Sequence, residues 1–249
     1  HFPTAFASAE SLIFLACDCL GLALHHHLET NEKIVLICFL TLSNMLEMLC
    51  SNSVTDDQRI ANAAKCRDYF IKRDISAQLS IALTRYKNNP IVCYVCLKSL
   101  HYLCLREGSS HFESVHKAIV SVMAAHGSDE LVLQWGCQAI GSMAMDGKNR
   151  DLLVTAGACE VVVGALQRGT RNREALVAVV FQKQIGSELL ALGSCMAAGS
   201  LCANDEGHQE KLGALGACEA VIKVLQKYDY HELTASAGCQ LIVALAKGQ

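Results

Sequence analysis

The sequence predicts an all-α fold in which helical repeats stack into an elongated array. Residues 157–168 (GACEVVVGALQR) return at residues 216–227 as GACEAVIKVLQK, with seven of twelve positions identical. Within the first copy Val161, Val162, Ala165 and Leu166 follow the period of a helix. Only two prolines in 249 residues interrupt such helices. One unit of this kind cannot bury its own apolar face, whereas a stack of units can.

The composition supports a folded chain and disfavours two other classes of protein. Apolar residues make up 52% of the chain and charged residues 18%, which is enough apolar surface to offset the entropy lost on ordering. The 24 acidic and 21 basic residues give a net charge of −3, so we expect no nucleic-acid partner. The longest apolar runs, 12–24 and 34–50, contain polar residues, so we expect buried core helices and no membrane span.

The repeats can be placed in order along the chain. A small or aliphatic residue marks the same place in a long helix at Thr41, Ser99, Ala139, Ala197 and Leu241, with spacings of 58, 40, 58 and 44. A single array then comprises N-terminal helices with a first repeat (1–50), a repeat with a polar insertion (51–110), a third repeat (111–156), a fourth with a helical insertion at 169–186 (157–215), and a last, truncated repeat (216–249). We expect the segment to be part of a larger chain or complex.

Signals for helix ends occur within the repeats. Gly157 and Gly216 stand where a left-handed turn would end a short helix. The sequences Ser-Asp-Glu at 128–130 and Asn-Asp-Glu at 204–206 place a capping side chain before an acidic first turn. A full repeat is therefore expected to hold a short, a medium and a long helix.

The repeat length and these motifs resemble the armadillo repeat. The resemblance rests on the glycine before the middle helix and on a third-helix pattern seen as TLSNM at 41–45, AIGSM at 139–143 and AAGSL at 197–201. It implies a right-handed armadillo-type α-solenoid of stacked two- and three-helix repeats. It also implies that the third helices line a concave groove that binds other proteins or extended peptides.

The resemblance assigns candidate groove residues by position. They are the third-helix residues Asn44, Lys98, Tyr102, Gln138, Ser142, Met196, Ser200 and Gln240. The importin-type members of the family carry columns of Trp and Asn at these positions, and here only Asn44 keeps that pattern. We therefore expect a groove that does not bind nuclear localisation signals.

The fourteen cysteines of the sequence follow the repeat. Cys137, Cys195 and Cys239 share one repeat position, and Cys159 and Cys218 share another, as expected for small buried hydrophobes. The Cys93–Cys96 pair has no second pair at a spacing suited to zinc. We expect reduced, metal-free cysteines, no cofactor and a cytoplasmic, reducing compartment.

Motifs for catalysis are missing from the sequence. It contains no phosphate-binding loop, no GxGxxG and no HExxH. The Gly-Ser pairs at 141–142 and 199–200 recur inside long helices, where they predict close helix packing, and His25, His26 and His27 predict a polar helix end. We expect no catalytic residue and no enzymatic activity.

One polar stretch offers an alternative binding surface. Its basic residues Arg59, Lys65, Arg67, Lys72 and Arg73 could attract an acidic partner. The favoured interpretation is a non-catalytic protein–protein interaction scaffold that uses the third-helix groove. Two alternatives stay open: an adaptor for an acidic peptide or cargo that uses the 59–87 patch, and a regulatory domain that positions the catalytic part of a larger enzyme.

Overall fold

The computed structural model describes residues 9–50, 57–105, 112, 114–170 and 180–246. The described residues form thirteen helices and no strand, which confirms the all-α prediction. The helices are α1 (Ala9–His27), α2 (Glu32–Cys50), α3 (Asp57–Ile71), α4 (Ile75–Arg85), α5 (Pro90–Cys104), α6 (His116–Ala125), α7 (Glu130–Met143), α8 (Gly147–Ala156), α9 (Ala158–Gly169), α10 (Val180–Leu201), α11 (Glu206–Ala214), α12 (Ala217–Lys227) and α13 (Glu232–Ala246).

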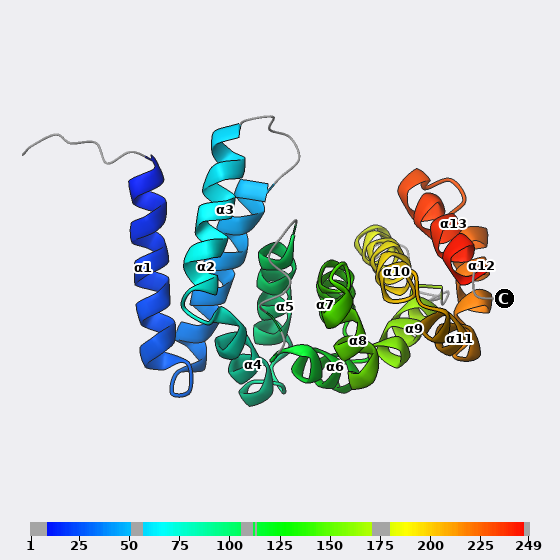
Figure 1. Cartoon of the computed structure of the whole chain (residues 1–249), viewed down its shortest axis with the longest axis horizontal. Coiled ribbons are helices and arrows are strands. Elements are labelled where there is room, and N and C mark those ends of the chain that lie inside the picture. The colour runs from blue at the N-terminus through cyan, green and yellow to red at the C-terminus, as the bar shows by residue number, and fades with distance from the viewer. Residues whose placement is uncertain (1–8, 51–56, 106–111, 113, 171–179, 247–249) are drawn as a thin grey trace, which may run out of the picture.

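The helices are arranged in two layers along a curved array. The long third helices α2, α5, α7, α10 and α13 pack one against the next in that order. In Figure 1, α5, α7, α10 and α13 lie on the upper, inner side of the curve, and α4, α6, α8 and α11 run along the lower side. The array therefore presents one continuous surface of third helices.

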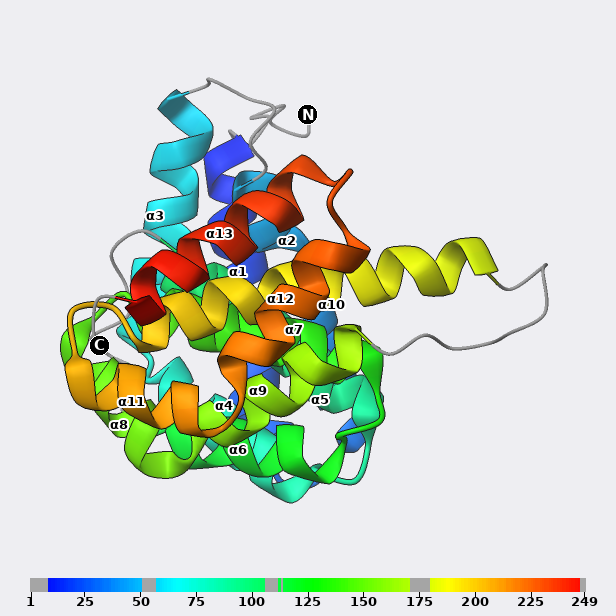
Figure 2. The same ribbon diagram turned by 90° about the vertical axis from the view of Figure 1, so that its right-hand side faces the viewer.

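Of the predicted helical insertion at 169–186, residues 171–179 lie outside the described residues. The part from Val180 onward begins α10, which has 22 residues where α7 has 14. In Figure 2 the first turns of α10 project beyond the body of the array. The predicted repeat boundaries stay predictions.

The predicted helix ends form, but the capping side chains are Asp129 and Asp205 and not Ser128 and Asn204, which precede them. Gly157 and Gly216 have φ angles of 98° and 87°, a left-handed conformation that a side chain would strain. Asp129 accepts a hydrogen bond from the backbone N–H of Val132 at 3.0 Å, and Asp205 accepts one from His208 at 2.8 Å. These aspartates satisfy N–H groups that have no partner inside their own helices.

Successive repeats are joined through the carbonyl groups at the ends of their second helices. Tyr86 donates to the carbonyl oxygen of Leu28 at 2.9 Å, and Tyr228 donates to that of Gly169 at 3.0 Å. Equivalent contacts join His126 to Lys87, Arg168 to Ser128 and Lys227 to Gly169. We call this series the carbonyl ladder; it connects the ends of α1, α4, α6, α9 and α12 in turn. Each rung satisfies a carbonyl group that the helix itself leaves open.

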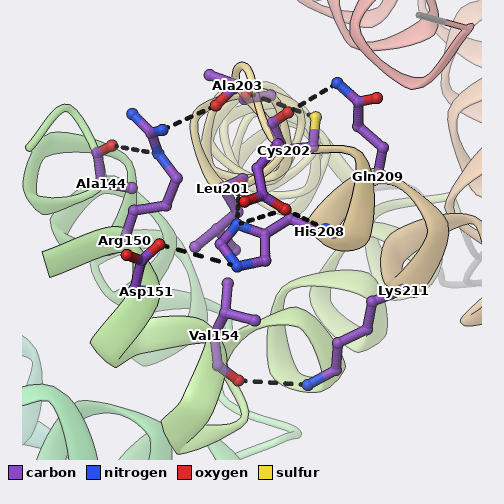
Figure 3. A network of polar contacts seen from close by, with 12 residues as sticks. Ala144, Arg150, Asp151, Val154, Leu201, Cys202, Ala203, His208, Gln209 and Lys211 are labelled. Atoms are coloured by element: carbon purple, nitrogen blue, oxygen red, sulfur yellow. Dashed lines mark hydrogen bonds and ion pairs between the residues drawn. The ribbon is translucent and has the colours of Figure 1, made fainter. Parts of the chain in front are cut away.

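A second group of polar contacts joins α8 to α11 and to the turn after α10 (Figure 3). Arg150 on α8 donates to the carbonyl oxygens of Ala144 at 3.1 Å and Ala203 at 2.7 Å. Lys211 on α11 donates to the carbonyl of Val154 at 3.3 Å and pairs with Glu160 at 3.0 Å. These side chains cap α7, α8 and the turn after α10, so they fix α11 against α8.

The buried residues differ from the sequence prediction at three places. In α9 Val163 is buried and Val161 only partly so. In α12 Ile222, which stands at the position matching Val163, is exposed. Cys137 and Cys195 are buried as predicted, but Cys239 is exposed and Cys218 partly so. Cys137 is covered by Ser194 of the next third helix, and no described helix covers the equivalent face of α13.

Candidate protein-binding groove

The third helices carry all eight predicted groove residues on described parts of the chain. Asn44 lies on α2, Lys98 and Tyr102 on α5, and Gln138 and Ser142 on α7. Met196 and Ser200 lie on α10 and Gln240 on α13. Asn44, Met196 and Gln240 are exposed and the other five are partly buried. That these residues bind a partner stays a prediction.

A groove with a cavity volume of about 510 Å³ runs across α5, α7 and α10. It brings together four of the predicted residues, Gln138, Ser142, Met196 and Ser200, and adds eight more: His101, Cys104, Leu105, Cys137, Gly141, Met145, Leu192 and Gly193. None of these lining residues carries a permanent charge. Met145 and Met196 are 76% and 58% exposed, so flexible apolar side chains form much of the accessible wall.

Gly141 on α7 and Gly193 on α10 lie where these two helices face each other below the groove. A Cβ on Gly141 would stand 3.5 Å from the backbone of Ala197, and one on Gly193 would stand 3.7 Å from the carbonyl of Gln134, which are ordinary van der Waals distances. A Cβ on Gly199 would meet nothing within 4 Å. The structure therefore does not require glycine for close helix packing at either Gly-Ser pair.

His101 supplies the polar edge of the groove. Its Nδ1 lies 2.8 Å from the Ser142 hydroxyl and 3.2 Å from the Gln138 carbonyl oxygen. Depending on the tautomer, Nδ1 donates to the Gln138 carbonyl oxygen or accepts from the Ser142 hydroxyl. Burial lowers the pKa of His101, and the Gln138 contact partly opposes that effect.

The positive charge of Lys98 is paired with a carboxylate on the inner face of the array. Its Nζ lies 2.7 Å from Glu47 and 3.3 Å from the Asn44 side-chain oxygen, both on α2. Tyr102 donates to the other oxygen of Glu47 at 3.2 Å. The same ammonium stands 5.4 Å from the centre of the Trp135 ring, within range of a cation–π contact. An acidic ligand would have to compete with Glu47 for this lysine.

Three residues of this surface were missed by sequence reasoning: Glu47, His101 and Trp135. His101 and Tyr102 each lie about 6 Å from the ring of Trp135, at 5.9 and 6.0 Å between ring centres. Trp135 precedes Gln138 by three residues, and residues at that spacing share a helix face. Trp135 therefore lies on the same face of α7 as the predicted groove residue Gln138, one helical turn before it.

The predicted basic patch is partly occupied by internal contacts. Arg67 donates to the carbonyl of Leu105, and Arg73 pairs with Asp18 at 3.3 Å and stacks 3.6 Å from the centre of the Tyr69 ring. Lys65 and Lys72 are exposed, and the side chain of Arg59 lies outside the described residues. The patch therefore offers fewer accessible cations than its sequence suggested.

The predictions about metal and membrane remain predictions. In the described residues no group of three or more His, Cys, Asp or Glu side chains could hold a metal ion. Among the described helices α2 is long and apolar enough to cross a bilayer, and α8 and α9 meet that test only together, with a bend of 78°. Core helices share these properties, and α2 packs against α1, α3 and α5.

Comparison with known proteins identifies the fold. No family model and no curated protein sequence matches this chain. An engineered protein solved by a structural genomics consortium matches with a TM-score of 0.59 and 14% identity, over 98% of this chain and 96% of its own. A designed armadillo repeat protein matches with a TM-score of 0.50 and 16% identity, over 95% of this chain and 94% of its own.

Another designed armadillo repeat protein, in complex with the peptide (KR)4, matches with a TM-score of 0.51 and 13% identity, over 96% of this chain and all of its own. Identities this low establish the fold alone. The fold is therefore an armadillo-type α-solenoid, as the sequence predicted.

Proposed function

We propose that this chain is a non-catalytic scaffold that binds an extended segment of another protein across α5, α7 and α10. The observation that carries the proposal is the groove of about 510 Å³, which lies on the third-helix surface and has exposed methionines on its wall. Concave, mostly apolar sites with a few polar groups are typical of ligand-binding surfaces. A structural neighbour that is a designed protein in complex with a peptide supports the same mode of binding.

The groove favours a ligand of a different charge from the (KR)4 peptide of that neighbour. Its lining residues carry no permanent charge, and His101, Gln138, Ser142 and Ser200 among them supply hydrogen-bonding groups. We expect an uncharged segment with a large apolar side chain that enters between Met145 and Met196. The acidic-cargo alternative is disfavoured, because Arg67 and Arg73 of the 59–87 patch are held by internal contacts with Leu105 and Asp18.

The test is a selection of displayed random peptides on the intact chain, followed by affinity measurements on two matched variants. Ser200→Trp fills the groove from α10, and Ser121→Trp places the same side chain on an exposed position of α6 outside it. We expect Ser200→Trp to weaken binding by at least about tenfold, the effect of losing a substantial interface contact. Ser121→Trp should leave the affinity unchanged, and both variants should keep the helical circular dichroism of the wild type.

A salt series separates the two kinds of ligand. An uncharged peptide should bind with the same affinity at low and high salt, whereas an electrostatic ligand loses affinity as salt screens its charges. Selected peptides that are rich in acidic residues, or that bind Ser200→Trp as tightly as the wild type, would overturn the proposal.

A further inference from the structure

Two buried thiols face each other where α1 packs on α3. The sulfur atoms of Cys17 and Cys66 lie 3.6 Å apart, although the residues are 49 positions apart in the sequence. Both side chains are fully buried. A disulfide places its two sulfur atoms about 2.05 Å apart, so this pair needs a modest approach and no rearrangement of distant segments.

The surroundings hold the two helices in register at this point. Asp18 follows Cys17 on α1 and contacts Tyr69 on α3 and Arg73 in the turn that follows α3. Gly21, one turn further along α1, lies under the same two side chains: a Cβ there would be 3.6 Å from each. The thiols therefore lie beneath a polar rim that fixes how α1 crosses α3.

The two thiols differ in their readiness to ionise. A hydrogen bond from Cys66 and the positive charge of Arg73 lower the pKa of Cys17, against the opposing effects of burial and Asp18. The contact with Cys17 and burial raise the pKa of Cys66. The directions of the two pKa shifts favour Cys17 over Cys66 as the attacking thiol. The thiolate is the form that attacks a disulfide.

We propose that Cys17 and Cys66 form a redox site, at which a small-molecule disulfide converts the two thiols into an intramolecular disulfide that ties α1 to α3. The Cys17 thiolate attacks one sulfur of the small disulfide, forms a mixed disulfide and releases one small thiolate. Cys66 then loses its proton to solvent and attacks the sulfur of Cys17, which releases the second small thiolate. The protein loses two hydrogen atoms, and the small disulfide is reduced to two thiols.

The position of the pair sets the rate and the structural effect. Because neither thiol is exposed, the reaction needs a local opening of α1 against α3. Once formed, the bond closes a loop that contains α2, the helix that carries Asn44 and Glu47 of the inner face. The disulfide therefore stabilises the helix at one end of that face. This inference is independent of which ligand the groove binds.

The experiment uses the full chain with Cys19→Ser as background, because Cys19 is exposed and lies two residues from Cys17. The folded protein is incubated with oxidised glutathione, alkylated under denaturing conditions and cut after lysine. Cleavage after Lys33, Lys65 and Lys72 separates Cys17 in peptide 1–33 from Cys66 in peptide 66–72, with Cys38 and Cys50 in peptide 34–65. We expect a linked 1–33/66–72 product on a monomeric chain.

Controls make the result specific. Cys17→Ala and Cys66→Ala should abolish the linked product, and Cys38→Ala, at a buried cysteine on α2, should retain it. Hydrogen exchange gives a second measurement: oxidation should slow amide exchange in α1 by at least about tenfold in the background protein and not in Cys17→Ala. Should an alanine variant fail to fold, the peptide map of the background protein still shows whether the Cys17–Cys66 disulfide forms, and its hydrogen exchange still shows whether that disulfide stabilises α1.

Three outcomes would overturn the proposal. The first is that both thiols remain open to alkylation after oxidation. The second is that Cys66 links instead to peptide 34–65, which would make Cys38 or Cys50, and not Cys17, its partner. The third is that the disulfide forms while exchange in α1 is unchanged.

Discussion

The phenolic hydroxyl of Tyr228 donates to the carbonyl oxygen of Gly169 at 3.0 Å, across 59 residues of sequence. This bond joins the end of α12 to the end of α9, and Tyr228 is almost fully buried there. The Tyr86–Leu28 bond joins the ends of α4 and α1 in the same way three repeats earlier, across 58 residues. In both places a tyrosine that follows the second helix of a repeat thus fixes the position of that repeat against the preceding one.

Tyr228→Phe is expected to destabilise the chain by about 1 kcal/mol, the net value of one intramolecular hydrogen bond. The loss stays at this level because Lys227 donates to the same carbonyl at 3.1 Å and keeps it satisfied. Urea unfolding should show a lower midpoint with an unchanged slope. Tyr230→Phe is the matched control, because Tyr230 is exposed and should leave the midpoint unchanged.

The fold could be predicted from the sequence because its signals are local and repeated. The recurrence of GACE at 157 and 216 indicates a helix, a left-handed glycine and another helix. Each of these is determined by residues that are neighbours in the sequence. The carbonyl ladder could not be predicted in this way. Its partners are 39 to 59 residues apart, and its donors are a tyrosine, a histidine, an arginine and a lysine, so no single residue type marks it.

The sequence predicted groove residues helix by helix, but it could not predict the contacts between helices. Gln138, Ser142, Met196 and Ser200 come from the repeat position, and the structure brings them together. The pairing of Lys98 with Glu47 joins two helices 51 residues apart and depends on the rotation of α2 against α5. Sequence position identified the lysine but gave no sign that its charge is already matched.

The Lys98–Glu47 pair is expected to contribute little to stability. Lys98 is 13% exposed but Glu47 is 47% exposed, so water screens the interaction. In a double-mutant cycle with Lys98→Met and Glu47→Gln, the coupling energy should be below about 1 kcal/mol. Glu47→Gln retains an oxygen for the Tyr102 hydroxyl, which keeps that contact out of the comparison. A coupling of several kcal/mol would show that the pair behaves as a buried one.

His101 should make the stability of the chain depend on pH. Burial lowers its pKa below the usual 6.5, so between the two pKa values the unfolded chain binds a proton that the folded chain does not. Stability is therefore complete above about 6.5 and falls as the pH decreases below that value. Thermal unfolding between neutral pH and about pH 5 should show a smaller loss of Tm in His101→Gln than in the wild type.

The exposed histidine His25 supplies the control for that measurement. His25→Gln, at the end of α1, should keep the wild-type slope of Tm against pH. An identical slope in wild type and His101→Gln would contradict the assignment of this pH dependence to His101.

The outer face of α12 and α13 is expected to drive association of the chain. Figure 2 views the array from this end, where both helices lie in front. Leu233 and Val243 on α13 are 73% and 56% exposed, and Ile222 on α12 is also exposed. Exposed apolar side chains on two neighbouring helices favour contact with another surface, because the contact removes them from water.

The expected result is a weight-average mass, measured by sedimentation or light scattering, that rises with protein concentration. The double variant Leu233→Lys, Val243→Lys should remain monomeric over the same range, because two charges on this face oppose its burial. Ile91→Lys provides the control: it puts the same charge on an exposed isoleucine of α5, far along the array, and should associate like the wild type. A wild-type chain that stays monomeric throughout, or a control that becomes monomeric as well, would show that α12 and α13 do not form the contact.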